Sequence, residues 1–163
     1  MNTNVRKLKI YLDTSVISYL FADEVPEKKA ETQKLWQDII SNKYDVYLSD
    51  TTLFEIMKCS QPKRDAMIAE LEKIKYTHLE INDEVQFLTN EYINNGVLSP
   101  NSKDDCSHIA FAVSARCNVI VSWNFKHLVN YKTNSNVKIV NAIINYGEIS
   151  IISPTMLNES EEV

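Results

Sequence analysis

Glycine and proline are scarce in this sequence, with two and four residues respectively among 163. A chain this poor in both lacks the flexible linkers and low-complexity segments that those residues build. We therefore predict a single domain over residues 1–163, which is long enough to bury a sizeable core. We expect an ordered core from about residue 8 to residue 153 and a flexible tail over residues 155–163.

Cysteine pairs and long apolar runs are also missing. Cys59, Cys106 and Cys117 form neither a C-x-x-C motif nor a zinc-ligand spacing, so we predict reduced cysteines. The start of the sequence has no apolar signal segment, and no apolar run approaches the roughly 20 residues of a membrane helix. These features predict a cytoplasmic protein that does not engage a membrane.

An excess of positive charge is absent too. The sequence has 17 Lys and Arg against 22 Asp and Glu, which gives a formal net charge of −5. This balance argues against a surface that attracts duplex nucleic acid through its overall charge. Any contact with nucleic acid would need a local basic patch or a bound metal ion.

Short apolar runs alternate with amphipathic segments along the chain. The apolar runs predict strands at residues 9–12, 46–48, 79–81, 119–121 and 137–140, and an edge strand or extended segment at 149–152. The segments between them predict helices at residues 16–21, 28–41, 51–57, 60–74, 82–96 and 102–116. This order is typical of an α/β fold with a mostly parallel sheet and helices on both faces.

The region from Ser102 to Leu128 is the most informative part of the sequence. Ser102 and Asp105 have the spacing of a helix capping box, and Val119–Val121 is a short apolar run of the buried-strand type. Polar residues begin again just after that run. Because open α/β sheets bind ligands at the carboxyl ends of their strands, we expect a functional site there.

Three acidic positions fall at that same edge of the predicted sheet. Asp13 ends the first strand, Glu55 lies one helical turn past the second, and Asp105, with Asp104 beside it, lies in the first turn of the helix before the fourth. Carboxylate oxygens are the usual ligands of Mg²⁺ and Mn²⁺. Because nearby negative charges repel one another unless a cation lies between them, this arrangement predicts a divalent metal site.

Each of these side chains also has a purely structural interpretation. Asp13 could cap the next helix, Glu55 could face solvent, and acids in a first helical turn are favoured by the helix dipole. We interpret His108 as a core or supporting residue rather than a ligand. Lys126 and His127 are interpreted as surface residues near the site. The case for a site therefore rests on the joint arrangement of the acids.

Three stretches occur in an order that resembles a known family. YLDTSVISYL, LSDTTLFEIMK and DCSHIAFAVSARCNVIVSWNFKHL resemble the motifs of PIN-domain nucleases, most of all the VapC-like toxins of prokaryotic toxin–antitoxin pairs. The similarity spans roughly residues 8–130. It implies a three-layer α/β/α domain and a Mg²⁺- or Mn²⁺-dependent endoribonuclease.

The resemblance also implies the catalytic residues. Asp13, Glu55 and Asp105 match the first, second and third acids of the family, and Asn124 stands at a fourth position that is often Asp. We expect Asp13 and Asp105 to hold the metal ion, partly through water. Glu55 and Asn124 would position ligands or the attacking water. Compared with the Asp that often stands at this position, Asn124 still offers a carbonyl oxygen but lacks the negative charge. The number of metal ions that the site can hold depends on this charge.

Four further residues are expected to support this site. Thr14 or Ser15 matches the small hydroxyl residue that often follows the first acid of the family. Asp104 precedes the third acid, and Ser122 follows the fourth strand.

The same family implies the partners. These would be an RNA substrate, cleaved to leave a 5′-phosphate and a 3′-hydroxyl, and a cognate antitoxin whose segment covers the acidic pocket. A homodimer is expected through the helices between residues 28 and 75.

Two other functions are compatible with parts of the pattern. A phosphatase of the haloacid-dehalogenase type also begins with Asp after a first strand, but it needs a second Asp two residues later, where this chain has Ser15. A PIN-like domain that has lost cleavage and only binds RNA or protein would fit Asn124 and the acidic balance.

Overall fold

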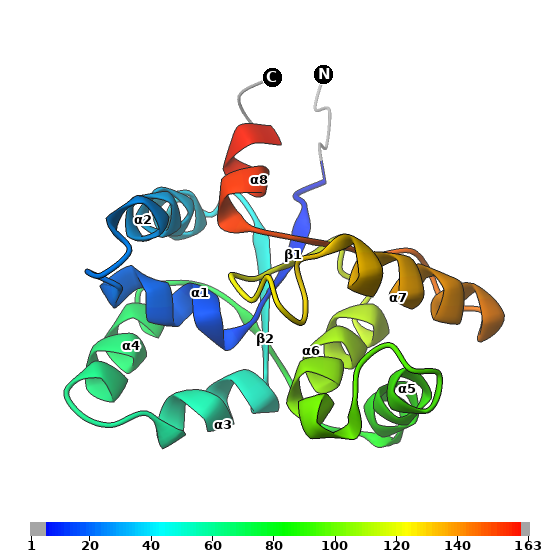
Figure 1. The fold of residues 1–163 in the computed structure, drawn as a ribbon. Coiled ribbons are helices and arrows are strands. Elements are labelled where there is room, and N and C mark those ends of the chain that lie inside the picture. The colour runs from blue at the N-terminus through cyan, green and yellow to red at the C-terminus, as the bar shows by residue number, and fades with distance from the viewer. Residues whose placement is uncertain (1–5, 161–163) are drawn as a thin grey trace.

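A five-stranded parallel sheet forms the centre of the molecule in a computed structural model, which describes residues 6–160 (Figure 1). The strand order is β3-β2-β1-β4-β5, and every pairing is parallel. The strands are β1 Lys9–Leu12, β2 Asp45–Ser49, β3 Thr77–Leu79, β4 Val119–Val121 and β5 Ser150–Ile152. All five carboxyl ends therefore lie at one edge, as the predicted parallel sheet requires.

Helices cover both faces of this sheet. One group consists of α1 Thr14–Ser18, the short 3-10 helix η1 Tyr19–Phe21, α2 Pro26–Ile40, α3 Asp50–Lys58, α4 Lys63–Leu71 and α8 Pro154–Ser160. The other consists of α5 Asp83–Asn94, the 3-10 helix η2 Pro100–Ser102, α6 Lys103–Ser114 and α7 Tyr131–Ile143. Figure 1 shows the two groups on opposite sides of β1 and β2. The predicted three-layer α/β/α architecture is confirmed.

The central strand β1 divides the apolar interior into two cores. Ile10 and Leu12 are buried in the core beneath α1, α2 and α4, whereas Tyr11 is buried in the core beneath α5, α6 and α7. Successive strand residues point to opposite faces of the sheet. The Tyr11 side chain therefore points to the face that α6 covers, and its hydroxyl lies under this helix.

Helix α6 is buried along most of its length, from Cys106 to Val113. Its small residues, Ala110 and Ala112, allow close packing against neighbouring elements, and both are fully buried. The chain leaves the helix through Arg116, whose φ of 58° turns the backbone toward β4. This packing fixes the first turn of α6, which carries Asp105, at the carboxyl edge of the sheet.

The prediction of a strand at residues 137–140 is wrong, because these residues lie within α7. Asn130 caps that helix by accepting a hydrogen bond from the Thr133 backbone N–H at 2.8 Å. The buried residues Thr133, Val137 and Val140 recur at helical spacing. The edge strand expected at 149–152 is present as β5, which pairs in parallel with β4.

The tail also differs from the expectation of a flexible segment over residues 155–163. Residues up to Ser160 form α8, which packs on α2. Leu157 is 1% exposed, and the Asn158 amide donates hydrogen bonds to the Glu31 carbonyl and carboxylate. The buried Leu157 side chain and the Asn158 hydrogen bonds thus hold α8 against α2. Residues 161–163 lie outside the described part of the chain.

The three cysteines are free, as predicted. Within residues 6–160, none of the helices has the length and apolar character needed to cross a membrane.

Candidate active site

Asp13 lies at the carboxyl end of β1, at the base of the candidate site. It is 5% exposed, and both of its carboxylate oxygens accept hydrogen bonds from serines. Ser15 donates to Oδ1 at 2.6 Å, and Ser122 donates to Oδ2 at 2.7 Å. Because Ser122 follows β4, this second bond joins the ends of two neighbouring strands.

The same two hydroxyls also hold the loop that follows β4. The Trp123 backbone N–H donates to Ser15 Oγ at 2.8 Å, and the Asn124 backbone N–H donates to Ser122 Oγ at 2.9 Å. Ser15 and Ser122 therefore each connect the Asp13 carboxylate to the backbone of this loop.

Thr14 has a different environment. Its Oγ1 is buried without a hydrogen-bonding partner among the described residues, yet its hydroxyl is near enough to help lower the pKa of Glu55. Asp104 is exposed in the first turn of α6.

Asn124 connects the loop to Asp105 on α6. Its Nδ2 donates to Asp105 Oδ1 at the long distance of 3.4 Å, and its Oδ1 accepts from the His127 backbone N–H at 3.0 Å. Because a backbone N–H can only donate, the second bond fixes which way the amide points. In this arrangement Asn124 turns an N–H group toward Asp105, and the carbonyl oxygen that we expected to face the site is directed away.

A buried histidine lies between the acids and the sheet. His108 is 2% exposed, with Nε2 at 2.6 Å from Glu55 Oε1 and Nδ1 at 2.6 Å from the Tyr11 hydroxyl. The Tyr11 hydroxyl also lies 2.6 Å from Ser49 Oγ. His108 is therefore a supporting residue, as interpreted from the sequence, and it holds Glu55.

The aspartate carboxyls lie in an environment that disfavours their charge. Burial is the main cause that raises the pKa of Asp13 and of Asp105. The positive charge of His108 opposes the shift at both groups, and the negative charge of Glu55 adds to it. A cation placed between these carboxylates would favour their ionised form.

Glu55 and His108 shift in the directions of an ion pair. Burial works to raise the pKa of Glu55, but the hydrogen bond and charge of His108 outweigh it, so the pKa is lowered. Burial works to lower the pKa of His108, but the hydrogen bond to Glu55 and the charges of the nearby acids outweigh it, so the pKa is raised. The two pKa shifts are in the directions by which a carboxylate and an imidazolium stabilise each other's charged form.

The acids do not form a ready-made three-residue metal cage. Among residues 6–160, no three His, Cys, Asp or Glu side chains are arranged to hold a metal ion together. Glu55 is instead paired with His108 through a hydrogen bond. Asp13 and Asp105 still suit Mg²⁺, because this ion often binds through one or two carboxylates and keeps several waters.

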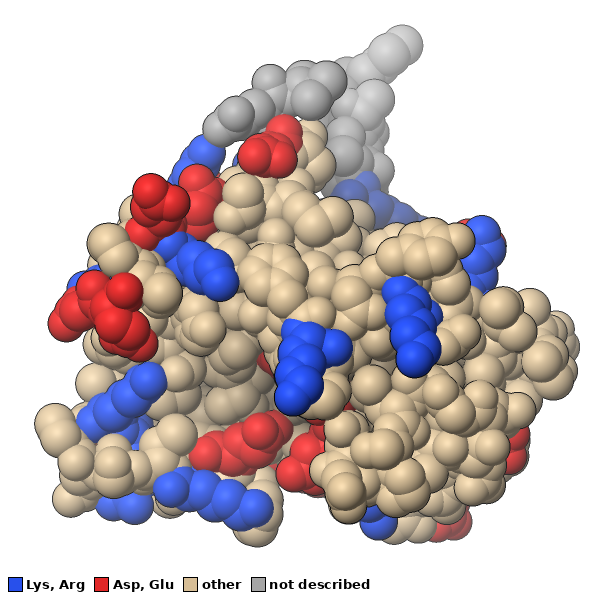
Figure 2. Space-filling model, in the orientation of Figure 1, with Lys and Arg blue, Asp and Glu red and all other residues tan. Residues whose placement is uncertain are grey.

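Lys and Arg side chains lie above, to the left of and below the acidic hollow, as seen in Figure 2. In the same view, Asp and Glu side chains lie inside a depression in the lower centre of this face. This face therefore combines an acidic centre with a basic rim.

Sequence reasoning missed Tyr11 as part of the site. The residue sits within an apolar strand, where an aromatic side chain is usually a core residue. The available signal was the alternation of side chains along β1. Tyr11 lies between Ile10 and Leu12, so its ring points to the opposite face of the sheet, toward the helix that carries Asp105.

Three solved structures share this fold at low sequence identity. VapC20 of Mycobacterium tuberculosis, a Sarcin-Ricin loop cleaving toxin, matches with TM-score 0.56 and 14% identity over 72% of this chain and 92% of that chain. VapBC-1 of nontypeable Haemophilus influenzae matches with TM-score 0.56 and 15% identity over 91% and 99%. VapBC2 of Rickettsia felis, bound to a DNA fragment from its promoter, matches with TM-score 0.52 and 14% identity over 89% and 98%.

No protein-family model and no curated protein sequence matches the chain significantly. The structural matches extend over nearly the whole length of the three known proteins, so the likeness concerns a complete domain. The fold predicted from the sequence motifs is therefore confirmed: this chain has a VapC-like, PIN-domain fold.

Proposed function

We propose that this protein is a metal-dependent endoribonuclease and the toxin of a toxin–antitoxin pair. The observation that carries the proposal is the chain of hydrogen bonds from Asp13 through Ser122 and Asn124 to Asp105. It joins the buried Asp13 carboxyl to the partly buried Asp105 carboxyl at the carboxyl edge of a VapC-like fold. One of the structural neighbours, VapC20, is a Sarcin-Ricin loop cleaving toxin, which supports RNA as the substrate class.

Asp13 and Asp105 are the residues that would hold Mg²⁺ or Mn²⁺ in this mechanism. The ion would supply an activated water and stabilise negative charge on the phosphoryl oxygen. Ser15 and Ser122 fix Asp13 in one orientation by donating to both of its oxygens. Asn124 directs an N–H group at Asp105, and His108 holds Glu55 at the edge of the pocket. Glu55 would accept a proton from, or orient, the attacking water.

The first experiment compares Asp13→Ala and Asp105→Ala with the parent protein on labelled RNA. We expect both variants to lose cleavage in Mg²⁺ and Mn²⁺ while keeping the circular dichroism spectrum of the parent. Asp83→Ala is the matched control, because Asp83 also lies in the first turn of a buried-face helix but is exposed and away from the acids. Cleavage by either aspartate variant at the parental rate would contradict the assignment.

A binding module that does not cleave is the second candidate function. The absence of a three-acid metal cage among residues 6–160, together with the amide at position 124, favours it. Titration with Mg²⁺ and Mn²⁺, followed by assays on single-stranded and structured RNA, separates the two. Binding of RNA without cleavage in either metal would select the module.

An antitoxin and a second copy of the chain are the proposed protein partners. Two of the three structural matches are VapBC complexes, which supports an antitoxin for this chain as well. Homodimerisation through α2–α4 and a cytoplasmic location are proposed from the same family. Analytical ultracentrifugation of the purified chain tests the dimer.

A further inference from the structure

Trp123 lies between the two residues that connect the loop after β4 to the aspartates. Ser122 precedes it and donates a hydrogen bond to Asp13. Asn124 follows it and contacts Asp105. The Trp123 side chain is only 4% exposed, although residues that follow a strand in a loop usually lie at the surface. A bulky buried side chain therefore anchors the loop segment that serves both carboxyls.

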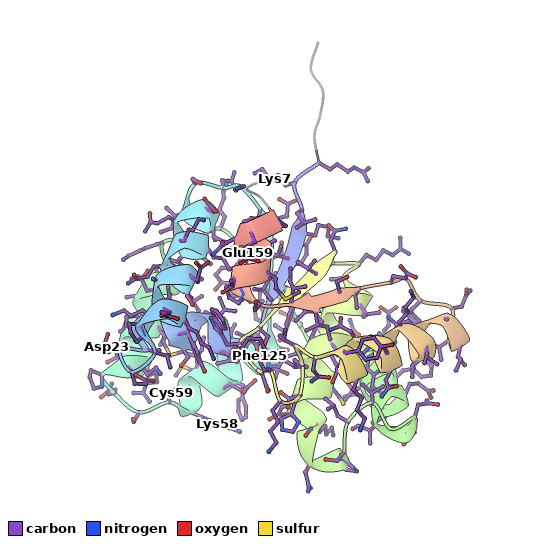
Figure 3. All side chains as sticks on the ribbon, turned by 45° about the horizontal axis from the view of Figure 1, so that its top comes forward. Lys7, Asp23, Lys58, Cys59, Phe125 and Glu159 are labelled. Carbon is purple, nitrogen blue, oxygen red and sulfur yellow. The ribbon has the colours of Figure 1, made fainter. Side chains whose placement is uncertain are left out.

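The indole ring is enclosed by residues of η1 and α2. It stacks on the Tyr19 ring, with centroids 5.6 Å apart and an interplanar angle of 15°. The Lys28 Nζ lies 5.5 Å from the indole centroid. Phe125 meets the indole edge-to-face at 6.0 Å, and Figure 3 shows Phe125 near the middle of the molecule, between the two groups of helices. These contacts leave the indole little freedom to move.

A hydrogen bond to α2 fixes the direction of the indole. Trp123 Nε1–H donates to Thr32 Oγ1 at 2.8 Å, and both side chains are buried. The Thr32 hydroxyl has a single hydrogen, which it donates to the Lys28 carbonyl at 2.6 Å. Only the lone pairs of the hydroxyl therefore face the indole, whose N–H can only donate. Because donor and acceptor match in this one arrangement, α2 holds Trp123 in one orientation.

The backbone of Trp123 connects this restraint to the acid. Its N–H donates to Ser15 Oγ at 2.8 Å, and the Ser15 hydroxyl donates its own hydrogen to Asp13 Oδ1 at 2.6 Å. Because that hydrogen is used on Asp13, the Trp123 N–H meets a lone pair of the Ser15 oxygen. Three hydrogen bonds in series thus run from Thr32 on α2 to the carboxylate at the end of β1.

We propose that Trp123 is a positioning residue for the Asp13 carboxylate. Its buried indole holds the Trp123 N–H against Ser15, and Ser15 keeps Asp13 in the orientation that binds the metal ion. This assignment rests on the ribonuclease function proposed above and adds a residue, remote from the substrate, on which the affinity of the metal site depends. Removal of a group that orients a metal ligand typically weakens metal binding by about 10- to 100-fold. Trp123 acts through Ser15, so we expect the lower end of that range.

The second tryptophan provides a matched control. Trp36 is also buried, and its Nε1–H donates to Glu70 Oε2 at 3.0 Å. Trp36→Phe and Trp123→Phe each remove one buried indole N–H and keep an aromatic ring, so both should lower the stability of the protein to urea. If Trp123 were only structural, the two variants would be equivalent at the metal site.

The test measures metal binding by calorimetry in the absence of RNA. Mg²⁺ and Mn²⁺ are titrated into the parent, Trp123→Phe, Thr32→Val and the double variant. We expect each single substitution to weaken binding by about 10-fold. The double variant should bind no more weakly than either single variant, because both changes break the same hydrogen bond. Trp36→Phe should bind both metals like the parent.

Cleavage of labelled RNA provides the second readout. Trp123→Phe should lower kcat at a limiting Mg²⁺ concentration, and a concentration well above the dissociation constant of the variant should restore it. KM for RNA should keep the parental value, because the indole is buried and does not face the substrate. Restoration by metal distinguishes a weakened metal site from a damaged fold. Trp36→Phe should reach its full kcat at the parental Mg²⁺ concentration.

The outcomes separate this role from the proposed function. Parental metal affinity in both Trp123→Phe and Thr32→Val, or an equal loss in Trp36→Phe, would overturn the positioning role even if the parent cleaves RNA. Weaker metal binding in these two variants alone, with no cleavage by the parent in either metal, would keep the positioning role and reject the nuclease. A parent that binds neither metal would reject both. If Trp123→Phe does not fold, Thr32→Val decides, since it breaks the same bond and leaves the indole in place.

Discussion

Tyr11, His108 and Glu55 form a chain of hydrogen bonds beneath the two aspartates. Each link is 2.6 Å long, and the chain continues from Tyr11 to Ser49 at the end of the neighbouring strand. Tyr11 and His108 are buried, so neither has water as an alternative partner. Orientation of Glu55 therefore depends on residues that do not face the pocket.

His108→Ala should destabilise the fold and reduce activity together. The change leaves the Tyr11 hydroxyl without one partner and Glu55 without its cation, and a buried polar group left unpaired costs about 1–3 kcal/mol. Urea unfolding followed by intrinsic fluorescence measures the loss. His108→Gln, which can still donate to Glu55, should recover part of the stability. If His108→Ala matches the parent in both stability and rate, the positioning role is wrong.

The paired shifts of Glu55 and His108 predict a pH optimum of stability. Glu55 has a lowered pKa, so its contribution is present above its unfolded value of 4.5 and is lost as pH falls through the folded value. His108 has a raised pKa, so its contribution is complete below its unfolded value of 6.5 and is lost as pH rises through the folded value. The pair should therefore stabilise most between about pH 4.5 and 6.5.

Thermal melts from pH 4 to pH 9 measure this dependence. The parent should lose stability toward pH 9 more steeply than His108→Gln, which cannot titrate. The raised pKa values of Asp13 and Asp105 act in the same direction, since their ionisation also costs more in the folded state. Mg²⁺ should reduce that cost, so its stabilising effect should be larger at pH 8 than at pH 5. Equal effects of Mg²⁺ at both pH values would contradict a site on these two carboxyls.

Asn124→Asp tests how the amide at position 124 affects the proposed metal site. The new carboxylate can still accept from the His127 N–H, but it replaces a donor facing Asp105 with a negative charge. We expect lower stability without metal and equal or tighter Mg²⁺ binding by calorimetry. Weaker binding than the parent would argue against a place for residue 124 in the metal site.

At the scale of elements, the unit formed by α6 and β4 brings the candidate site together. The helix delivers Asp105 and His108, and the strand delivers Ser122 and Asn124. Sequence patterns predicted this unit because both elements have the composition that deep burial demands. The same patterns failed at 137–140, where four apolar or long side chains fit either a strand or the buried stripe of a helix.

The site was harder to foresee than the elements that carry it. The positions of Asp13, Glu55 and Asp105 relative to the strands followed from the parallel topology. The direction of the Asn124 amide did not, because it depends on the backbone N–H of His127 in a loop. The pairing of Glu55 with His108 likewise joins two helices, α3 and α6, through residues that are 53 positions apart in the sequence.

Helix α8 offers a test of an element that the sequence did not predict. Leu157 is 1% exposed against α2, so Leu157→Ala should cost about 2–5 kcal/mol. Met156→Ala, on the exposed side of the same helix, should cost much less, because Met156 is 48% exposed. Chemical denaturation of the two variants makes the comparison. Similar values for both would mean that α8 does not contribute to the core.

At the scale of the whole molecule, two helical layers enclose a sheet, and acidic and basic side chains are unevenly distributed along the carboxyl edge of this sheet. The acidic pocket lies at the ends of β1 and β4. A separate groove between residues 96–102 and 125–133 is lined by Lys126, His127 and Lys132 but by no Asp or Glu. The formal net charge of −5 therefore says little about the local field at this edge. An anionic substrate would be held by a few well-placed cations, and its binding should weaken sharply with salt.

The bond between Ser122 and Asp13 joins residues that are 109 positions apart. During synthesis, β1 leaves the ribosome long before β4, its neighbour in the sheet. The Asp13 carboxyl group therefore acquires its Ser122 partner only after β4 has been made. A nascent fragment ending before residue 119 would lack both Ser122 and Asn124. In the ribonuclease proposed above, this order would delay activity until β4 and the loop that follows it have been synthesised.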